Sequence, residues 1–175
     1  SEPLRLAQAI ENRFKRQATL VNDVNAALLA EYHAGAARGR RSAVGIWIGT
    51  GIGGGLILDG KLLTGVRGGA GELGHIPTQD RGARCGCGGY DCVETHASRT
   101  AIERYILAEL DGGSVSMIQE STNGATRAVE FEHVVDALRK GDELATRAID
   151  RAVRNIAIAT GTVANILDPE IIVFG

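Results

Sequence analysis

The sequence Cys85-Gly86-Cys87-Gly88-Gly89-Tyr90-Asp91-Cys92 holds all three cysteines of the 175-residue chain, and nine residues separate it from His75. Three thiolates and one imidazole make a complete tetrahedral shell for one zinc ion. Because protein atoms would fill every position of that shell, the zinc would be structural rather than catalytic. We therefore expect His75, Cys85, Cys87 and Cys92 to hold a zinc ion that fixes the local fold.

Disulfide bonds or an iron–sulfur cluster would account for the cysteines less well. An odd number of cysteines leaves one thiol outside a disulfide framework, and a Cys-x-Cys pair bridged to itself closes a strained ring. Iron–sulfur clusters usually take four cysteines, and this chain has three. Three unrelated buried cysteines remain an alternative, although the surrounding glycine-rich, polar sequence is poor core material. No secretory signal precedes the cluster, so we expect a cytoplasmic protein with reduced thiols.

Length and composition exclude several classes of protein. A chain of 175 residues fits one domain or slightly more. The net charge of −2 gives no electrostatic footprint for nucleic acid. No apolar run approaches the roughly 20 residues that span a bilayer. We therefore expect neither nucleic acid nor membrane as a partner of this segment.

Apolar periodicity predicts alternating helices and strands, which indicates an α/β fold. Asp59-Gly60 is typical of a two-residue type I′ hairpin turn between two of the strands. Helices are expected at residues 3–14, 24–32, 97–110, 130–140 and 143–167, and strands at 18–21, 43–48, 56–58, 61–63 and 171–174.

Two of these helices carry apolar stripes that we expect to be buried. Strands 18–21 and 171–174 are expected to be buried as well, and Asp23 is a candidate cap for the helix that follows it. The stripe of helix 3–14 consists of Leu4, Leu6, Ala7, Ile10 and Phe14. The stripe of helix 143–167 consists of Ile149, Val153, Ile156, Thr160, Val163 and Leu167.

A glycine-rich turn, Gly49-Thr50-Gly51-Ile52-Gly53-Gly54-Gly55, directly follows the strand at 43–48. Glycines let the backbone approach a ligand closely, and successive N–H groups form a nest for anions. The pattern is neither a P-loop nor a dinucleotide-binding fingerprint, because a second strand follows rather than a helix. The segment could bind phosphate, or it could be no more than a flexible tight turn.

Polar side chains lie on both sides of the cysteine cluster. Glu72 and His75 are three residues apart, and Glu94 follows Cys92 by two residues. A zinc ion would bring Glu72, His75 and Glu94 close together, and these groups are suited to bind sugar hydroxyls. His96 is a further candidate for the same site. Each glutamate taken alone is equally consistent with a solvated surface charge.

Four motifs occur in the order that is typical of the ROK family, whose name stands for repressors, open reading frames and sugar kinases. The chain resembles this family from about residue 3 to residue 175, and the His–Cys cluster is the most specific of the motifs. The motifs are Asn22-Asp23-Val24-Asn25-Ala26-Ala27, Gly49-Thr50-Gly51-Ile52-Gly53-Gly54-Gly55, Ala70-Gly71-Glu72-Leu73-Gly74-His75 and Cys85-Gly86-Cys87-Gly88-Gly89-Tyr90-Asp91-Cys92-Val93-Glu94.

The resemblance implies an actin-like ATPase or hexokinase fold (ribonuclease H-like) with a structural zinc site. Residues 1–40 would form the tail of the small lobe, and residues 41–175 would form much of the large lobe. The implied function is ATP-dependent phosphorylation of a hexose, as in a glucokinase, with Mg²⁺ bridging the phosphates. Family members are often dimers or tetramers, so we expect a homo-oligomer.

The resemblance also implies roles for individual residues. Asp23 matches the catalytic base, which takes the proton of the sugar hydroxyl. Asn22, Glu72, His75 and Glu94 match the family's sugar-binding residues, together with Asp23 itself. Thr50, Gly51, Gly53 and Gly54 match its phosphate-contacting hairpin. His75 would then serve both the zinc and the sugar.

The chain departs from the family pattern at both ends. It has no Asp-x-Gly-x-Thr phosphate loop before the first helix, and no glycine-rich adenosine segment follows Gly175. We therefore expect a partial chain that phosphorylates nothing by itself. Two other functions remain open: the sugar-sensing part of a ROK repressor, and a zinc-stabilised interaction module without a small ligand.

Overall fold

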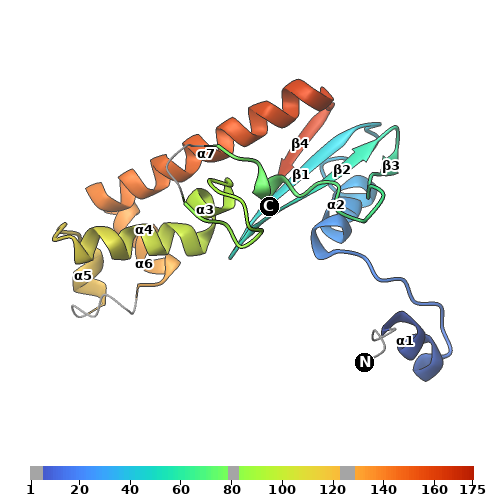
Figure 1. Cartoon of the computed structure of the whole chain (residues 1–175), viewed down its shortest axis with the longest axis horizontal. Coiled ribbons are helices and arrows are strands. Elements are labelled where there is room, and N and C mark those ends of the chain that lie inside the picture. The colour runs from blue at the N-terminus through green and yellow to red at the C-terminus, as the bar shows by residue number, and fades with distance from the viewer. Residues whose placement is uncertain (1–5, 79–82, 123–128) are drawn as a thin grey trace.

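The computed structural model of the chain describes residues 6–78, 83–122 and 129–175. These residues form an α/β fold, as the sequence predicts, with an η1 turn of 3-10 helix (Figure 1). None of the helices within these ranges combines the length and apolarity that crossing a membrane requires. In chain order the elements are α1 Leu6–Phe14, α2 Asp23–Ala34, β1 Ala43–Ile48, β2 Ile52–Leu58, β3 Lys61–Leu62, η1 Leu73–His75, α3 Glu94–Ala97, α4 Arg99–Asp111, α5 Ile118–Ser121, α6 Phe131–Arg139, α7 Glu143–Leu167 and β4 Ile171–Phe174.

The four strands form one sheet in the order β3-β2-β1-β4. β1 and β2 make an antiparallel hairpin in which Ile48 pairs with Ile52, and β1 pairs with β4 in parallel. The turn between β2 and β3 has φ angles of 49° at Asp59 and 75° at Gly60. Positive φ at both positions is the signature of a type I′ turn, which confirms the sequence prediction.

Side chains alternate along β1 and divide the core between the two faces of the sheet. Val44 and Ile46 belong to the cluster that packs under α7, whereas Ala43 packs with Leu28 of α2. Figure 1 shows α2 and α7 on opposite sides of the sheet. Leu28 is 0% exposed, and burying such a side chain contributes about 1.5–3 kcal/mol. α2 is thereby fixed against the hairpin.

α7 has the predicted bounds, and Val163 of the predicted stripe is buried, but most of the buried face consists of other residues. Val153, a member of the predicted stripe, is 56% exposed, and Ile149, Ile156 and Leu167 are only partly buried. Small side chains let α7 approach α3 and α4 closely, so the alanines take the inner face. The buried residues of α7 are Leu144, Ala145, Ala148, Ala152, Asn155, Ala159 and Val163.

The predicted helix at 97–110 is interrupted. Ser98 has an extended backbone, and its side chain accepts a hydrogen bond from the Ala101 amide at 3.1 Å, so it caps α4. The preceding residues form the separate short helix α3. This break lets α3, which begins at Glu94, point in its own direction.

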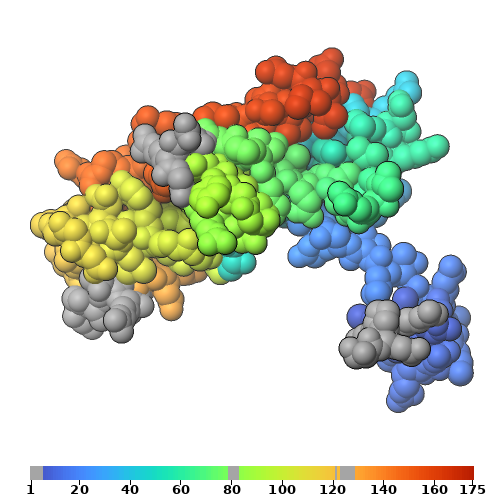
Figure 2. Space-filling model, in the orientation of Figure 1, coloured from blue at the N-terminus to red at the C-terminus, as the bar shows by residue number. Residues whose placement is uncertain are grey.

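Three predictions of burial are wrong. α1 forms, but it has no buried residue, and Phe14 is 67% exposed; Leu4 lies outside the described residues. Residues 18–21 are not a strand, and Leu20 is 58% exposed. β4 is a strand, but Ile171, Ile172 and Val173 are only partly buried and Phe174 is 52% exposed. Figures 1 and 2 show α1 set apart from the rest, so no other described element covers its apolar side.

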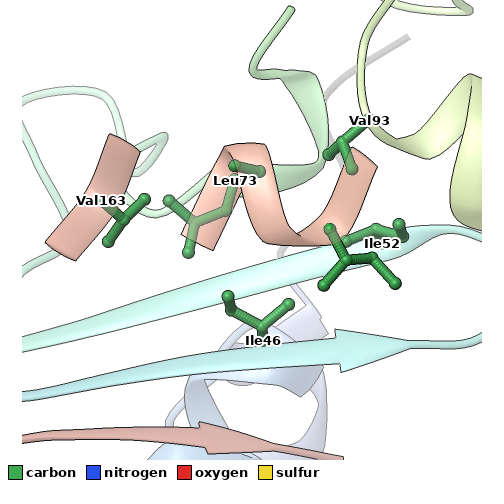
Figure 3. A pocket seen from close by; sticks show the side chains of 7 residues that line it. Ile46, Ile52, Leu73, Val93 and Val163 are labelled. Carbon is green, nitrogen blue, oxygen red and sulfur yellow. The ribbon is translucent and has the colours of Figure 1, made fainter. Parts of the chain in front are cut away.

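A small cavity lies between the sheet and α7 (Figure 3). Its volume is about 10 Å³, and its lining is entirely apolar, including Ile46, Leu73 and Val163. A cavity of this size holds at most one water, and an apolar one stays dry. It is therefore a packing defect rather than a ligand site.

Candidate functional site

The four predicted zinc ligands come together. One ligand atom from each of His75, Cys85, Cys87 and Cys92 lies within 4.8 Å of all the others. The Nδ1 atom of His75 is 3.5 Å from the Cys85 sulfur, and the sulfurs of Cys87 and Cys92 are 3.7 Å apart. Zinc–sulfur bonds of about 2.3 Å at tetrahedral angles place two sulfurs about 3.8 Å apart. The donor set and its spacing therefore fit one tetrahedral zinc.

Residues 84–92, which we call the cysteine loop, have a backbone conformation that holds the three thiols close together. Cys85 donates its N–H to the Gly89 carbonyl at 2.9 Å, and the Gly89 amide lies 3.4 Å from the Cys87 sulfur. That amide hydrogen bond lowers the pKa of the Cys87 thiol. Burial raises the pKa of the Cys92 thiol to about 12, so Cys92 needs a cation to become a thiolate at neutral pH. This combination is suited to a metal ion.

His75 presents its two ring nitrogens to different partners. Nδ1 faces the Cys85 sulfur, whereas Nε2 is 4.0 Å from the Glu72 carboxylate. The His75 side chain is half-buried, and Glu72 is exposed. The imidazole can therefore bind a metal with one nitrogen and face outward with the other, while its predicted contact with a sugar stays a prediction.

His96 does not line the candidate site. It is 1% exposed and lies between two charged side chains. Its Nε2 is 3.1 Å from Asp91, and its Nδ1 is 2.6 Å from the Arg151 guanidinium. Because guanidinium can only donate, Nδ1 accepts and Nε2–H donates to the carboxylate. His96 thus connects the cysteine loop to α7, which sequence reasoning missed because Arg151 is 55 residues away.

α2 begins at Asp23, but Asn22 is its cap. The Asn22 side-chain oxygen accepts from the amides of Val24 and Asn25 at 3.0 and 3.1 Å. The suggested capping role of Asp23 is therefore wrong. Asp23 is exposed, and within the described part of the chain its carboxylate accepts just a local hydrogen bond from the Val24 amide at 2.9 Å. Its carboxylate stands at the first turn of a helix, where a negative charge is favoured.

The hairpin glycines allow close packing on both sides. A Cβ on Gly53 would collide with the Val24 side chain, and a Cβ on Gly54 would collide with the Gly71 carbonyl oxygen. Gly53 thus lets the start of α2 lie against the hairpin, which brings Asp23 next to it. Close packing thus explains why Gly53 and Gly54 are glycines. Their contacts with phosphate stay a prediction.

Glu94 is attached to the tip of the hairpin. Its carboxylate accepts a hydrogen bond from the Ile52 amide at 2.8 Å. A Cβ on Gly51 would lie 2.5 Å from the same carboxylate oxygen. The glycine at this position therefore makes room for Glu94, and sequence spacing gave no sign of this pairing.

One recess unites most of the predicted substrate residues. Its volume is about 330 Å³, which suits a monosaccharide or a phosphate group. Glu72 and His75 are not among its lining residues, so the structure does not bring them into this recess. The lining residues are Asn22, Asp23, Val24, Trp47, Gly49, Thr50, Gly51, Ile52, Gly53 and Glu94.

The sequence matches the ROK family over residues 2–175. The glucokinase of Thermotoga maritima is 36% identical over 170 residues, which are 97% of this chain and 53% of that protein. The DNA-binding transcriptional dual regulator NagC of Escherichia coli K12 is 31% identical, over 96% of this chain and 40% of its own length. The crystal structure of a ROK family glucokinase from Streptomyces griseus, in complex with glucose and AMPPNP, superposes with a TM-score of 0.84 at 32% identity. It covers 97% of this chain and 55% of that one. The chain therefore spans about half the length of the glucokinases that it matches.

Proposed function

Because the chain belongs to the ROK family, we propose that it carries the sugar site and part of the phosphate site of an ATP-dependent hexose kinase. Glucokinases are among its relatives, and the structure has the same fold as a ROK family glucokinase. The observation that carries the proposal is the recess that holds Asp23, Thr50 and Glu94 together. A base, a sugar ligand and a phosphate hairpin need this proximity for direct phosphoryl transfer.

In this proposal Asp23 is the general base. It accepts the proton of the acceptor hydroxyl, usually that on C6, while the hydroxyl oxygen attacks the γ-phosphate of ATP and ADP leaves. Phosphoryl transfer depends mainly on positioning and charge neutralisation, and Mg²⁺ bound to the phosphates supplies the latter. Thr50 and the amides of the hairpin that follows it would hold the phosphate group.

The sugar is held by carboxylates and an imidazole. Glu94, fixed by the Ile52 amide, accepts from sugar hydroxyls in the recess. Asn22 can donate from its amide nitrogen, because its oxygen is occupied in capping α2. We propose that Glu72 and His75, which do not line the recess, contact the same sugar from outside it.

The cluster His75, Cys85, Cys87 and Cys92 would hold the structural zinc ion. A metal on Nδ1 would fix the His75 tautomer, so that Nε2 carries the hydrogen and can donate a hydrogen bond to a sugar oxygen. The zinc would hold His75 and the three cysteines in place and would take no part in the transfer. The same zinc cluster and His75 would serve a sugar sensor of the family as well as an enzyme.

A repressor is the second candidate, because NagC is 31% identical over almost the whole chain. A sensor needs the sugar ligands but has no need of a phosphate hairpin beside a base. The Asp23–Thr50 recess therefore favours the kinase. Upstream sequence that encodes a helix-turn-helix would favour the repressor.

The experiment is Asp23→Asn in the protein encoded by the complete reading frame, assayed with ATP and a panel of hexoses. We expect kcat to fall by about 10²–10⁴-fold while the sugar affinity changes little. Asp59→Asn, in the exposed hairpin turn, is the matched control and should leave kcat unchanged. Equal losses of kcat and of sugar affinity would contradict the role of Asp23 as the base.

A further inference from the structure

A second recess, distinct from the one that holds Asp23, lies between the cysteine loop, α4 and α7. Its volume is about 340 Å³. Of the described residues that line it, three are arginines, Arg84, Arg104 and Arg151, and none is acidic; Thr95 and Tyr105 add polar groups. Several guanidinium groups, with no carboxylate among the described lining residues, favour an anionic ligand.

One of these arginines is held in place before any ligand arrives. The Arg151 guanidinium bonds to Nδ1 of His96 at 2.6 Å, and its central carbon lies 5.0 Å from the centre of the Tyr105 ring. Arg151 is half-buried, so these contacts are partly shielded from water. Stacking on Tyr105 and the hydrogen bond to His96 therefore hold the Arg151 guanidinium in one orientation beside the recess.

The other two arginines are exposed at the rim. Arg84 comes from the cysteine loop and Arg104 from α4, on the two sides of the recess. Among the described residues, neither side chain forms an ion pair with a carboxylate, whereas Arg99, on the same helix as Arg104, pairs with Glu103 at 3.9 Å. The positive charge of Arg84 and Arg104 is therefore left uncompensated by the described chain.

The recess shares lining residues with a smaller recess that borders the proposed catalytic site. The smaller recess, of about 140 Å³, shares Arg84, Thr95 and Arg104 with it. The same smaller recess shares Thr50 and Glu94 with the recess of Asp23. Arg84 and Arg104 therefore lie on the same side of the molecule as the proposed sugar site, with the smaller recess between them.

We propose that the recess of Arg84, Arg104 and Arg151 is an anion site that binds a phosphate or carboxylate group. Guanidinium groups bind such anions through paired, charge-assisted hydrogen bonds. The anion has two potential sources: a substituent of the acceptor sugar at the end remote from the phosphorylated hydroxyl, or a separate anionic effector. The site itself is independent of the proposed kinase activity, but the first source rests on it.

The test is calorimetric titration of the full-length protein with inorganic phosphate at constant ionic strength. We expect saturable binding that is weakened at least about tenfold in the double variant Arg84→Gln/Arg104→Gln, because two charged donors are lost. Arg147→Gln is the matched control. Arg147 lies one turn before Arg151 on α7 but pairs with Glu109, so phosphate binding should be unchanged.

Two results would overturn the proposal: no saturable phosphate binding, or equal affinity in the wild type and the double variant. The second result would place the phosphate elsewhere, for example at the glycine hairpin. A circular dichroism spectrum and a thermal melt of the double variant check that it is folded. The Asp23→Asn protein should bind phosphate normally, so failure of the anion site and failure of the kinase proposal are distinguishable.

A second titration identifies the source of the anion. If the anion belongs to the acceptor, glucose 1-phosphate binds more tightly than glucose or phosphate alone, and the double variant removes only that gain. If the anion is a separate effector, glucose and phosphate bind together, and the sugar phosphate has no advantage. Both results support the site and assign its ligand.

Discussion

Two glycine-rich segments meet at the candidate site, and they are held in different ways. In the hairpin, a side chain on Gly54 would collide with the backbone of Gly71. In the cysteine loop, a Cβ on Gly86 or Gly88 would meet no described atom within 4 Å. The hairpin is therefore shaped by packing against neighbouring elements. The cysteine loop is shaped by its thiols and by the buried contact of Asp91 with His96.

The comparison teaches that abundant glycine has no single meaning. Crowded glycines bring Asp23 and Glu94 to the hairpin, because missing side chains let α2 and α3 approach. Uncrowded glycines let a loop turn around a metal. Substitutions and metal removal should separate the two cases.

Loss of the metal should have the largest effect, and only on the cysteine loop. Cys87→Ser should lose the zinc and lower the free energy of local opening of the cysteine loop by more than about 4 kcal/mol, because metal binding adds directly to the folding of the segment that holds the metal. The KM for sugar should rise, since His75 loses its anchor. Metal analysis, hydrogen exchange and steady-state kinetics measure these changes. Faster amide hydrogen exchange in residues 48–55 as well as in 85–92 would show that the hairpin also depends on the metal. Wild-type protein without zinc would refute the double role of His75.

Gly54→Ala tests the packing of the hairpin. The new methyl group meets backbone that cannot rotate away, so we expect a loss of about 2–3 kcal/mol in the free energy of unfolding. The control is Gly86→Ala in the cysteine loop, where there is space, and its effect should stay within about 0.5 kcal/mol. Chemical denaturation decides between them. Similar losses in the two variants would show that both segments are shaped by packing.

Gly51→Ala should affect function more than stability. Its Cβ would lie 2.5 Å from the Glu94 carboxylate, and that side chain can move away at the cost of its hydrogen bond to Ile52. We expect the KM for sugar to rise about tenfold with a smaller change in kcat, in line with one lost charged hydrogen bond. Gly69→Ala is the control, because Gly69 does not line the recess and its Cβ would meet no described atom within 4 Å. An unchanged KM would show that Glu94 does not hold the sugar.

The helix cap at Asp142 lies outside both glycine-rich segments, and its removal should give the smallest change in stability. Asp142 caps α7 and accepts hydrogen bonds from the Ala145 and Met117 amides, both at 2.8 Å. Burial acts to raise the pKa of Asp142, but these hydrogen bonds outweigh it and lower the pKa. A lowered pKa means that the stabilisation is present above the unfolded-state pKa of about 3.9 and is lost as the pH falls through the folded-state value.

Asp142→Ala should therefore cost about 1 kcal/mol at neutral pH. The difference from the wild type should shrink once the pH falls below about 4. Denaturation across pH measures it, and Asp136→Ala on the exposed face of α6 is the control. A difference that persists in acid would mean that the carboxylate charge is not what stabilises the cap.

Local sequence patterns predicted the elements where one pattern extends over many residues. β1 and α7 have the predicted bounds. A continuous apolar run is a strong signal for β1, and a helical periodicity that continues over 25 residues is a strong signal for α7. The buried faces were less predictable. Periodicity identifies an apolar stripe, but it does not show what covers it, as Phe14 and Val153 demonstrate. His96 and Arg151 were missed for a related reason, because their contact joins residues far apart in the chain.

Residue types at short spacings were enough to identify the family, the α/β fold class and the donor set His75, Cys85, Cys87 and Cys92. The folded arrangement sets which groups share a recess. It placed Asp23 beside Thr50 and Glu94, left Glu72 and His75 outside that recess, and brought three arginines together behind it. The physical reason is that the packing of α2, α3, α4 and α7 sets these distances, and packing depends on shape across the whole core rather than on neighbours in the chain.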